Sequence, residues 1–232
     1  TGGGYTMSRM KFFFVAAMMV LLGSCGGSGD DASADAAAET RMTFFLTSAG
    51  SGNGADLGGL AGADQRCEML ADAAGAGDLT WHAYLSASAT ADAAAVNARD
   101  RIGSGPWYNH ALVQVASDIA NLHGESNGLT KESVLNEMGG MTNGRGDDPN
   151  RHDILTGSEL DGTALGGDDD TTCQNWTGSG EGSARVGHFD RQGGGDNPTS
   201  WNNAHASRGC SQEDLQGSGG DGLYYCFAID RL

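Results

Sequence analysis

Two stretches decide the fold: Leu57-Gly58-Gly59-Leu60-Ala61-Gly62-Ala63-Asp64-Gln65-Arg66-Cys67 near the start, and Leu223-Tyr224-Tyr225-Cys226-Phe227-Ala228 near the end. From Leu60 the apolar residues recur at helical spacing as far as Ala74, and two glycines follow. The first stretch therefore predicts a helix with Cys67 on its buried face. The second stretch is rich in aromatic residues and predicts a strand that carries Cys226.

Further elements follow from the same patterns. Residues 42–48 predict the first strand, residues 81–85 a second, and residues 183–189 one near the C-terminus. Residues 111–122 and 130–138 are weaker candidates for a strand and a helix. Residues 139–170 are mostly Gly, Asp, Asn and Thr and predict a long loop. The plan is α+β, and we expect the last strand to pair near the first.

The N-terminal region predicts export. Residues 7–11 carry Arg9 and Lys11, and an uncharged apolar run follows at residues 12–22. This run is too short to span a bilayer, which needs about 20 apolar residues, and it is typical of a signal peptide. Small residues precede Cys25, as in the bacterial lipobox that this segment resembles. We therefore expect cleavage before Cys25 and lipidation of its thiol, the alternative being an ordinary secretory peptide with a coincidental free thiol.

These features predict three segments. Residues 1–24 are a signal peptide with an upstream extension before Met7, and residues 25–41 are the lipidated cysteine and a tether. The tether lacks aromatic and large aliphatic residues, so we expect it to be flexible. Residues 42–232 form one domain. By resemblance to other lipoproteins, Gly26 after the cysteine favours the outer membrane, with the domain in the periplasm or on the surface.

The charge of the chain excludes one class of partner. There are 13 Lys and Arg against 30 Asp and Glu, and cleavage before Cys25 removes two basic residues, which leaves 11 − 30 = −19. Nucleic acid would be repelled by such a protein. The 39 glycines show no fixed repeat and predict many turns. Four cysteines in this body are typical of an exported domain with two disulfides, and the residues alone leave three pairings open.

Several stretches together resemble a known family, the lectin-like domain of leptospiral endostatin-like outer-membrane lipoproteins. The resemblance covers about residues 43–228. The stretches that carry it are residues 45–48, 57–67, 98–109, 150–158, 186–202, 207–212 and 223–228.

This resemblance implies a C-type-lectin-like fold, an α+β domain with long loops and two disulfides. In that fold the cysteine of the first helix pairs with the cysteine of the last strand, and the two middle cysteines pair with each other. Carried over, the disulfides are Cys67–Cys226 and Cys173–Cys210. The first would close almost the whole domain.

A sugar site is a second implication. Trp201-Asn202-Asn203 resembles the Trp-Asn-Asp motif of sugar-binding C-type lectins, whose oxygens bind Ca²⁺. Asn203 replaces the Asp of that motif, and the usual partner motif is absent, although Asp196 lies nearby. We name Trp201, Asn202, Asn203 and Trp176 as candidate ligand-binding residues. The alternative is that the tryptophans are core residues and the asparagines cap turns.

Other polar groups are weaker candidates. Asp168 and Asp170 in a Gly-rich loop could converge on a cation such as Ca²⁺, and Asp153 is a lesser candidate of the same kind. The alternative is a solvated acidic loop. No pair of histidines has helical metal-binding spacing, but His188 and His205 lie in the matched C-terminal stretch and could face one site. A structural hydrogen-bonding role is the alternative that the sequence favours.

The sequence therefore predicts a lipid-anchored bacterial envelope protein whose domain binds carbohydrate or an extracellular glycoprotein and is not an enzyme. Its contact with the membrane is through the lipid anchor only. A structural or adhesive envelope protein without small-molecule binding is the first alternative. An uncharacterised hydrolase is the second, although no motif for a catalytic serine, a phosphate loop or a dinucleotide is present.

Overall fold

A computed structural model describes residues 1–3 and 41–230 of the chain. Residues 4–24 of the expected signal peptide, Cys25 and nearly all of the expected tether lie outside the described residues. Among the helices that the structure does describe, none combines the length and the apolar character needed to cross a bilayer.

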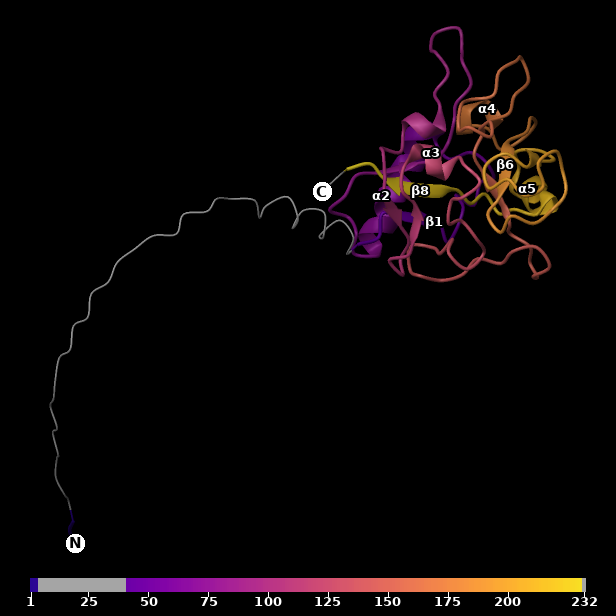
Figure 1. Cartoon of the computed structure of the whole chain (residues 1–232). Coiled ribbons are helices and arrows are strands. Elements are labelled where there is room, and N and C mark those ends of the chain that lie inside the picture. The colour runs from indigo at the N-terminus through magenta and orange to yellow at the C-terminus, as the bar shows by residue number, and fades with distance from the viewer. Residues whose placement is uncertain (4–40, 231–232) are drawn as a thin grey trace, which may run out of the picture.

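A three-stranded antiparallel sheet forms the centre of the domain, in the order β1-β8-β2 (Figure 1). It consists of β1 (Phe44–Leu46), β8 (Tyr225–Ala228) and β2 (Trp81–Ala83). The last strand thus lies between two early ones, with Phe45 opposite Cys226 on one side and Ala83 opposite Cys226 on the other. The predicted pairing of the first and last strands is confirmed.

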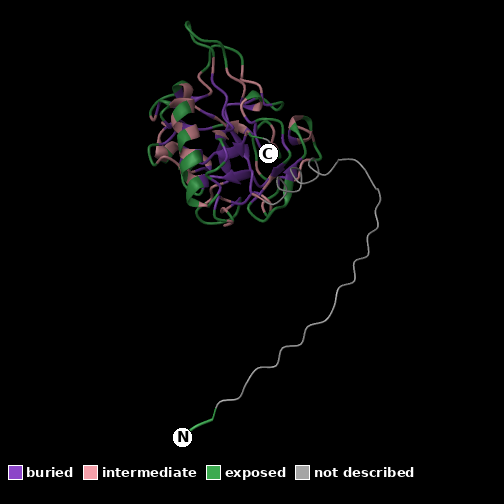
Figure 2. Cartoon of the chain, turned by 90° about the vertical axis from the view of Figure 1, so that its left-hand side faces the viewer, coloured by how far each residue is buried: buried purple, intermediate pink, exposed green. Residues whose placement is uncertain are grey.

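The helix α2 (Gly59–Ala73) covers one face of this sheet. Ala63, Cys67 and Ala71 are its buried residues, at the helical spacing that the sequence shows, while its outer face is exposed (Figure 2). Cys67 forms a disulfide with Cys226 of the central strand. The helix, the position of Cys67 on its buried face and this disulfide are as predicted.

The other face of the sheet carries a second hydrophobic core. Since side chains alternate along a strand, Phe45 and Cys226 face α2, whereas Phe44 and Phe227 face the opposite way. There the Phe44 and Phe227 rings pack at a centroid distance of 4.9 Å. Burial on both faces explains why the central strand is so aromatic.

The smaller elements surround these two cores. A second three-stranded sheet has the order β5-β6-β7, and β3 pairs with β4. Their bounds are β3 (Trp107–Tyr108), β4 (Gln114–Ala116), β5 (Asp153–Leu155), β6 (Arg185–His188) and β7 (His205–Ala206). The short helices are η1 (Ala98–Asp100), α3 (Ile119–Leu122), α4 (Cys173–Trp176) and α5 (Gln212–Ser218).

The turn labelled α4 is unusual because all four of its residues have positive φ, between 49° and 67°. Non-glycine residues rarely adopt this left-handed conformation. Here Cys173 is fixed by its disulfide to Cys210, and the Trp176 indole is buried and donates to the carbonyl of Ser86 at 2.7 Å. The second predicted disulfide is therefore present, and it holds a turn that the sequence did not predict.

Two predictions of local structure were wrong, and one helix was missed. Residues 130–138 form turns rather than a helix, and the expected loop at residues 139–170 contains β5. The helix α5, which begins with Ser211 as a side-chain cap, was not predicted.

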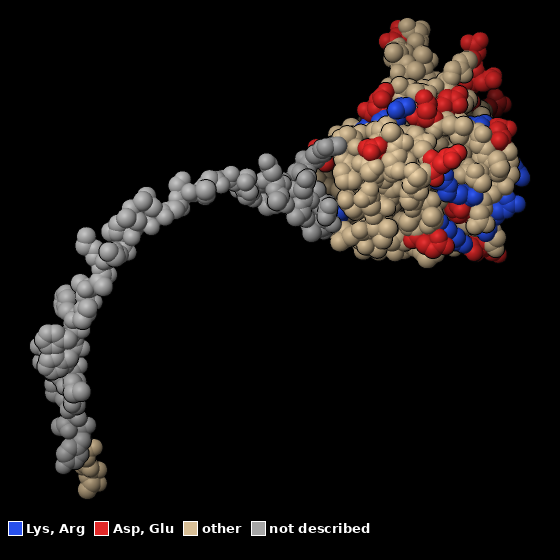
Figure 3. All heavy atoms as spheres, viewed as in Figure 1, with Lys and Arg blue, Asp and Glu red and all other residues tan. Residues whose placement is uncertain are grey.

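Two loops, near residues 90 and 168, project from the body, and acidic side chains lie on them (Figure 3). The domain as a whole contains both helices and small antiparallel sheets, and it has two disulfides.

Candidate metal centre

The tryptophans predicted to contact a ligand belong to the core. Trp176 is fully buried and Trp201 is 3% exposed. The Trp201 ring packs against those of Tyr84 and Tyr225 at centroid distances of 4.7 and 5.3 Å. Neither indole offers a face on which a sugar ring could stack, so the structural alternative describes them better.

The asparagines of the predicted sugar site are also buried and bonded within the protein. Asn202 Nδ2 donates to Tyr84 Oη at 3.0 Å and to the carbonyl of Glu159 at 2.9 Å. Asn203 Oδ1 accepts from Arg185 Nε at 2.5 Å. An amide oxygen that already faces a guanidinium is a poor ligand for another cation. The described contacts therefore do not favour a lectin-type Ca²⁺ site at these two residues.

Tyr84, which accepts from Asn202, also donates a hydrogen bond to His123. This buried histidine leads to a prediction of how the stability of the domain depends on pH. His123 Nδ1 donates to the carbonyl of Ile119 at 2.9 Å, so Nε2 accepts from Tyr84 Oη at 2.7 Å. Burial is the main cause that lowers the pKa of His123. Because the unfolded chain takes up a proton near pH 6.5 and the folded one only at lower pH, this residue makes the domain less stable as the pH falls below about 6.5.

We expect this loss to be smaller in His123→Gln, whose amide can still accept from Tyr84. The measurement is the urea midpoint at neutral and mildly acidic pH, for both proteins and with chelator present throughout. An equal pH dependence in the two proteins would show that His123 does not titrate in this way.

The aspartates proposed as cation ligands do not converge with the asparagines. The Asp196 side chain is 71% exposed and pairs with Arg185 at 3.0 Å. Asp168 is exposed on the projecting loop, and Asp170 Oδ1 accepts from the backbone N–H groups of Thr172 and Gln174 at 3.1 and 3.0 Å. Asp170 thus stabilises the turn that begins α4.

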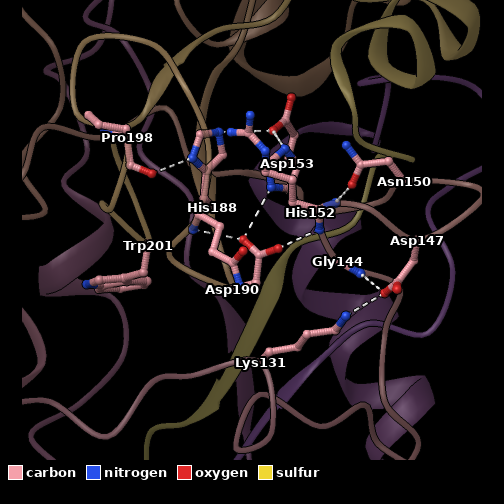
Figure 4. Close-up of polar contacts among 12 residues, drawn as sticks. Lys131, Gly144, Asp147, Asn150, His152, Asp153, His188, Asp190, Pro198 and Trp201 are labelled. Carbon is pink, nitrogen blue, oxygen red and sulfur yellow. Dashed lines mark hydrogen bonds and ion pairs between the residues drawn. The ribbon is translucent and has the colours of Figure 1, made fainter.

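A different cluster lies at one end of the sheet β5-β6-β7. Asp153 is the first residue of β5 and pairs in register with His188, the last residue of β6. His205 begins β7 opposite Val186, two residues before His188, so these three side chains share one face. His152 directly precedes β5 and forms with Asp153 and His188 a group whose candidate ligand atoms all lie within 4.8 Å of one another (Figure 4). His205 contacts Asp153 but lies outside this group.

Four polar atoms meet in this cluster. The Nε2 atoms of His152, His188 and His205 lie 3.2, 3.3 and 3.5 Å from Asp153 Oδ1. His152, Asp153 and His188 are buried, and the His205 side chain is 24% exposed. Despite the short distances, both Asp153 oxygens and His188 Nε2 lack a partner with hydrogen-bond geometry. Buried polar groups are rarely left in this state, so the cluster calls for an additional group.

The contacts of the other ring nitrogen, Nδ1, indicate which kind of group would fit beside each Nε2. Nδ1 of His188 lies 2.8 Å from the carbonyl oxygen of Pro198, and Nδ1 of His205 lies 3.0 Å from that of Ala206. A carbonyl oxygen only accepts, so each Nδ1 carries the proton, and in neutral imidazole each Nε2 presents a lone pair. His152 Nδ1 lies 3.2 Å from Asp190 Oδ1. Such outer contacts are typical of histidines that bind a metal.

The carboxylates keep the cluster negative. Burial raises the pKa of Asp190, but contacts with His152 and with the backbone N–H groups of Arg145 and Gln192 outweigh burial, and the pKa is lowered. The pKa of Asp153 is also lowered, because contacts with His188 and His205 outweigh its burial. Asp153 therefore faces the histidine nitrogens as an anion.

A negative carboxylate opposite three lone pairs requires a cation between them. Protons could supply part of this charge, and the contact with Asp153 raises the pKa of His205. However, the rings of His152 and His188 stack in parallel at a centroid distance of 4.3 Å, so protonating both would place two like charges face to face. A single metal ion would neutralise Asp153 and bind the Nε2 atoms of His152 and His188, with His205 beside it.

The distances to Asp153 Oδ1 are compatible with such an ion, and His152, Asp153 and His188 are the residues whose ligand atoms converge. Zn²⁺ binds nitrogen and oxygen ligands at about 2.0–2.1 Å in a tetrahedron, whose edge is then about 3.3 Å. The three separations between nitrogen and Oδ1, at 3.2, 3.3 and 3.5 Å, are close to that edge. Three imidazoles and one carboxylate also match the ligands that Zn²⁺ takes.

Glycines make room around these ligands. A Cβ atom on Gly193 would overlap the His188 ring, and one on Gly195 would lie 2.9 Å from His205 Cβ. Gly219 is the third, because its Cβ would lie 3.4 Å from His152 Nε2. Gly193 and Gly195 therefore have a steric reason to lack side chains.

Sequence reasoning found parts of this centre without assembling it. It singled out His188 and His205 as a pair and Asp153 as a weak cation candidate, but it did not combine them or include His152. Comparison of the chain with protein-family models and with curated protein sequences found no match.

Proposed function

We propose that this chain is a lipid-anchored envelope protein whose domain binds one divalent transition-metal ion through His152, Asp153, His188 and His205. The observation that supports this most is the meeting of three imidazole nitrogens on one buried, otherwise unpartnered carboxylate. Zn²⁺ is the ion that suits these ligands, whereas Ca²⁺ prefers oxygen ligands alone.

The role of the ion is structural in this proposal. His152, Asp153 and His188 form the convergent part of the site, and a shift of the partly exposed His205 side chain would complete a tetrahedron. Four protein ligands leave no open position for a substrate, which is the pattern of structural rather than catalytic zinc. The ligands come from β5, β6 and β7, so the ion joins all three strands of the small sheet. It would also hold the loop between β6 and β7, because Pro198 accepts from His188.

The finer fold assignment and the location belong to the same proposal. A C-type-lectin-like fold is supported by the pairing of the first and last strands, by the disulfide from α2 to β8 and by the long loops. Lipidation of Cys25 and an outer-membrane location rest on the sequence. Binding of carbohydrate or glycoprotein stays a prediction from the resemblance, since the residues named for it are buried.

Metal binding is tested on the purified protein after treatment with chelator. We expect isothermal titration calorimetry to give one Zn²⁺ per molecule, and thermal melting to shift upward with Zn²⁺ because the ion binds only the folded state. Calcium should have neither effect. In His205→Gln, at the most exposed ligand, we expect Zn²⁺ affinity to fall by at least about 100-fold, the upper range for loss of an outer-shell contact.

The matched control is His110→Gln, an exposed histidine outside the cluster, which should bind Zn²⁺ as the wild type does. A wild-type protein that takes up no Zn²⁺, or a His205→Gln protein that binds it with unchanged affinity, would refute the proposal. A Co²⁺ absorption spectrum then reports whether the coordination is tetrahedral.

A further inference from the structure

Exposed apolar side chains gather on two neighbouring turns. Leu112, Val113, Met138 and Met141 are 46, 52, 64 and 60% exposed, and they are four of the six large apolar side chains that are exposed in the described part of the chain. We call these four residues the apolar patch. Single exposed apolar residues are ordinary, but a group of them marks a contact surface.

Packing and hydrogen bonds hold the two turns together. Asn109 Nδ2 donates to the carbonyl of Ser133 at 2.8 Å. The His110 ring lies against Gly139, where a Cβ atom would come within 2.7 Å of Nδ1. The first turn is therefore fixed beside the second, and the apolar patch is one surface.

Leu112 is held in a strained conformation. Its φ is 60°, in the left-handed region that a leucine rarely adopts, and its side chain is not buried in return. The hairpin imposes this conformation, since Asn109 N–H donates to the carbonyl of Val113 at 3.0 Å. Strain of this kind tends to occur where a side chain is displayed for a function.

The apolar patch is also free of charge in a strongly acidic molecule. Residues 107–117 and 138–142 contain no Asp, Glu, Lys or Arg, although the chain has a net charge of −17. The nearest carboxylate in sequence, Glu137, is 3% exposed and accepts from Ser48 N at 3.0 Å. The two turns carry no charge, and the hollow beside Leu112 is lined by charges of both signs, Arg41 against Asp72 and Asp78. Such a surface suits an uncharged or zwitterionic partner.

The position of the patch indicates which partner this is. Arg41 and Met42 line the same hollow, of about 720 Å³, as His110 and Leu112. Thr43 N–H donates to the carbonyl of Tyr108 at 2.9 Å. The patch thus adjoins the point where the chain from Cys25 enters the domain. At about 3.4 Å per residue, the 15 residues at positions 26–40 keep this point within about 55 Å of Cys25.

From these observations we infer that the apolar patch docks on the lipid surface that holds the anchor, with Leu112, Val113, Met138 and Met141 inserted at the level of the headgroups. This inference rests on the lipid anchor of the proposed function. The domain would then lie on the membrane in one orientation, with the projecting acidic loops free. Interfacial binding grows with the apolar area that is inserted, and attachment close to the bilayer favours it further.

The test uses lipidated protein in phosphatidylcholine vesicles, because anionic lipids would repel an acidic domain. Hydrogen exchange is followed by mass spectrometry for protein in vesicles and for protein in detergent micelles. We expect slower exchange of residues 110–113 and 138–141 in vesicles. This difference should be lost when Leu112, Val113, Met138 and Met141 are all replaced by serine. The control is Met69→Ser with Leu160→Ser, which removes the two other exposed apolar side chains and should keep the difference.

The outcomes separate docking from anchoring. Mass spectrometry of Cys25 reports the anchor by itself. If Cys25 carries lipid and the patch exchanges equally fast in vesicles and micelles, docking is refuted and the anchor stands. If Cys25 carries none, the anchor is refuted, and co-sedimentation of the soluble protein with the same vesicles decides docking. Protection that instead grows with protein concentration in the absence of lipid would assign the patch to a second copy of the chain and overturn the inference.

Discussion

Replacing both Cys67 and Cys226 by alanine is expected to lower the free energy of unfolding by about 5 kcal/mol. The bridge closes a loop of 159 residues, and the loop-entropy relation gives about this value for that length. Domains of this kind have about 5–15 kcal/mol in total, so the variant should be close to unfolding at room temperature. The measurement is urea denaturation of wild type and variant, with chelator in both so that metal binding does not contribute.

The second disulfide gives the comparison. Cys173–Cys210 closes a loop of 37 residues, for which the same relation gives about 4 kcal/mol. Its removal should release the left-handed turn at α4 and leave the central sheet intact. A loss below about 1 kcal/mol for the Cys67 and Cys226 variant would show that strand pairing and the two cores hold the domain without its longest covalent link.

Gly187→Ala is expected to cost at least about 3 kcal/mol and to abolish metal binding. Gly187 lies in β6, and a Cβ atom there would overlap the backbone carbonyl of Trp201. Because backbone atoms must move, the cost exceeds that of ordinary overpacking, which is about 1–3 kcal/mol. The same backbone segment supplies Ser200 and Pro198, whose carbonyls accept from the N–H and Nδ1 of His188.

Gly194→Ala is the matched control, since no atom lies within 4 Å of a Cβ built there and its φ is not in the left-handed region. We expect it to change stability by less than about 0.5 kcal/mol. Urea midpoints and Zn²⁺ titrations of both variants check this pair. A Gly187→Ala protein with normal stability and normal Zn²⁺ binding would contradict the close contact between β6 and residues 200–202.

The sequence predicted the elements whose pattern is strong. The helix around Cys67 and the strand around Cys226 have clear apolar periods, and the structure confirms both, together with the two disulfides. It missed β5 because Asp153, Ile154 and Leu155 are too few to show a period, and α5 because its only buried residue is Leu215. Residues 130–138 suggested a helix, yet they turn to bring Leu135 opposite Met141.

The metal centre could not be assembled from spacing. After the adjacent pair at residues 152 and 153, His188 follows 35 residues later and His205 another 17 residues on, and strand register brings them together. Metal motifs that are read from a sequence depend on short helical or turn spacings. Trp201 and Asn202 show the opposite difficulty, because a short motif predicted a surface ligand site whereas both side chains are buried in the structure.

The central place of β8 has a consequence for how this chain can mature. A polypeptide that emerges with its N-terminus first delivers β1 and β2 long before residues 225–228, which must insert between them. Neither early strand pairs with the other, so the sheet forms only after residues 225–228 have emerged. Truncation before Tyr225 would remove the middle of the sheet and one half of its longest disulfide, and such fragments should be cleared by proteases instead of accumulating.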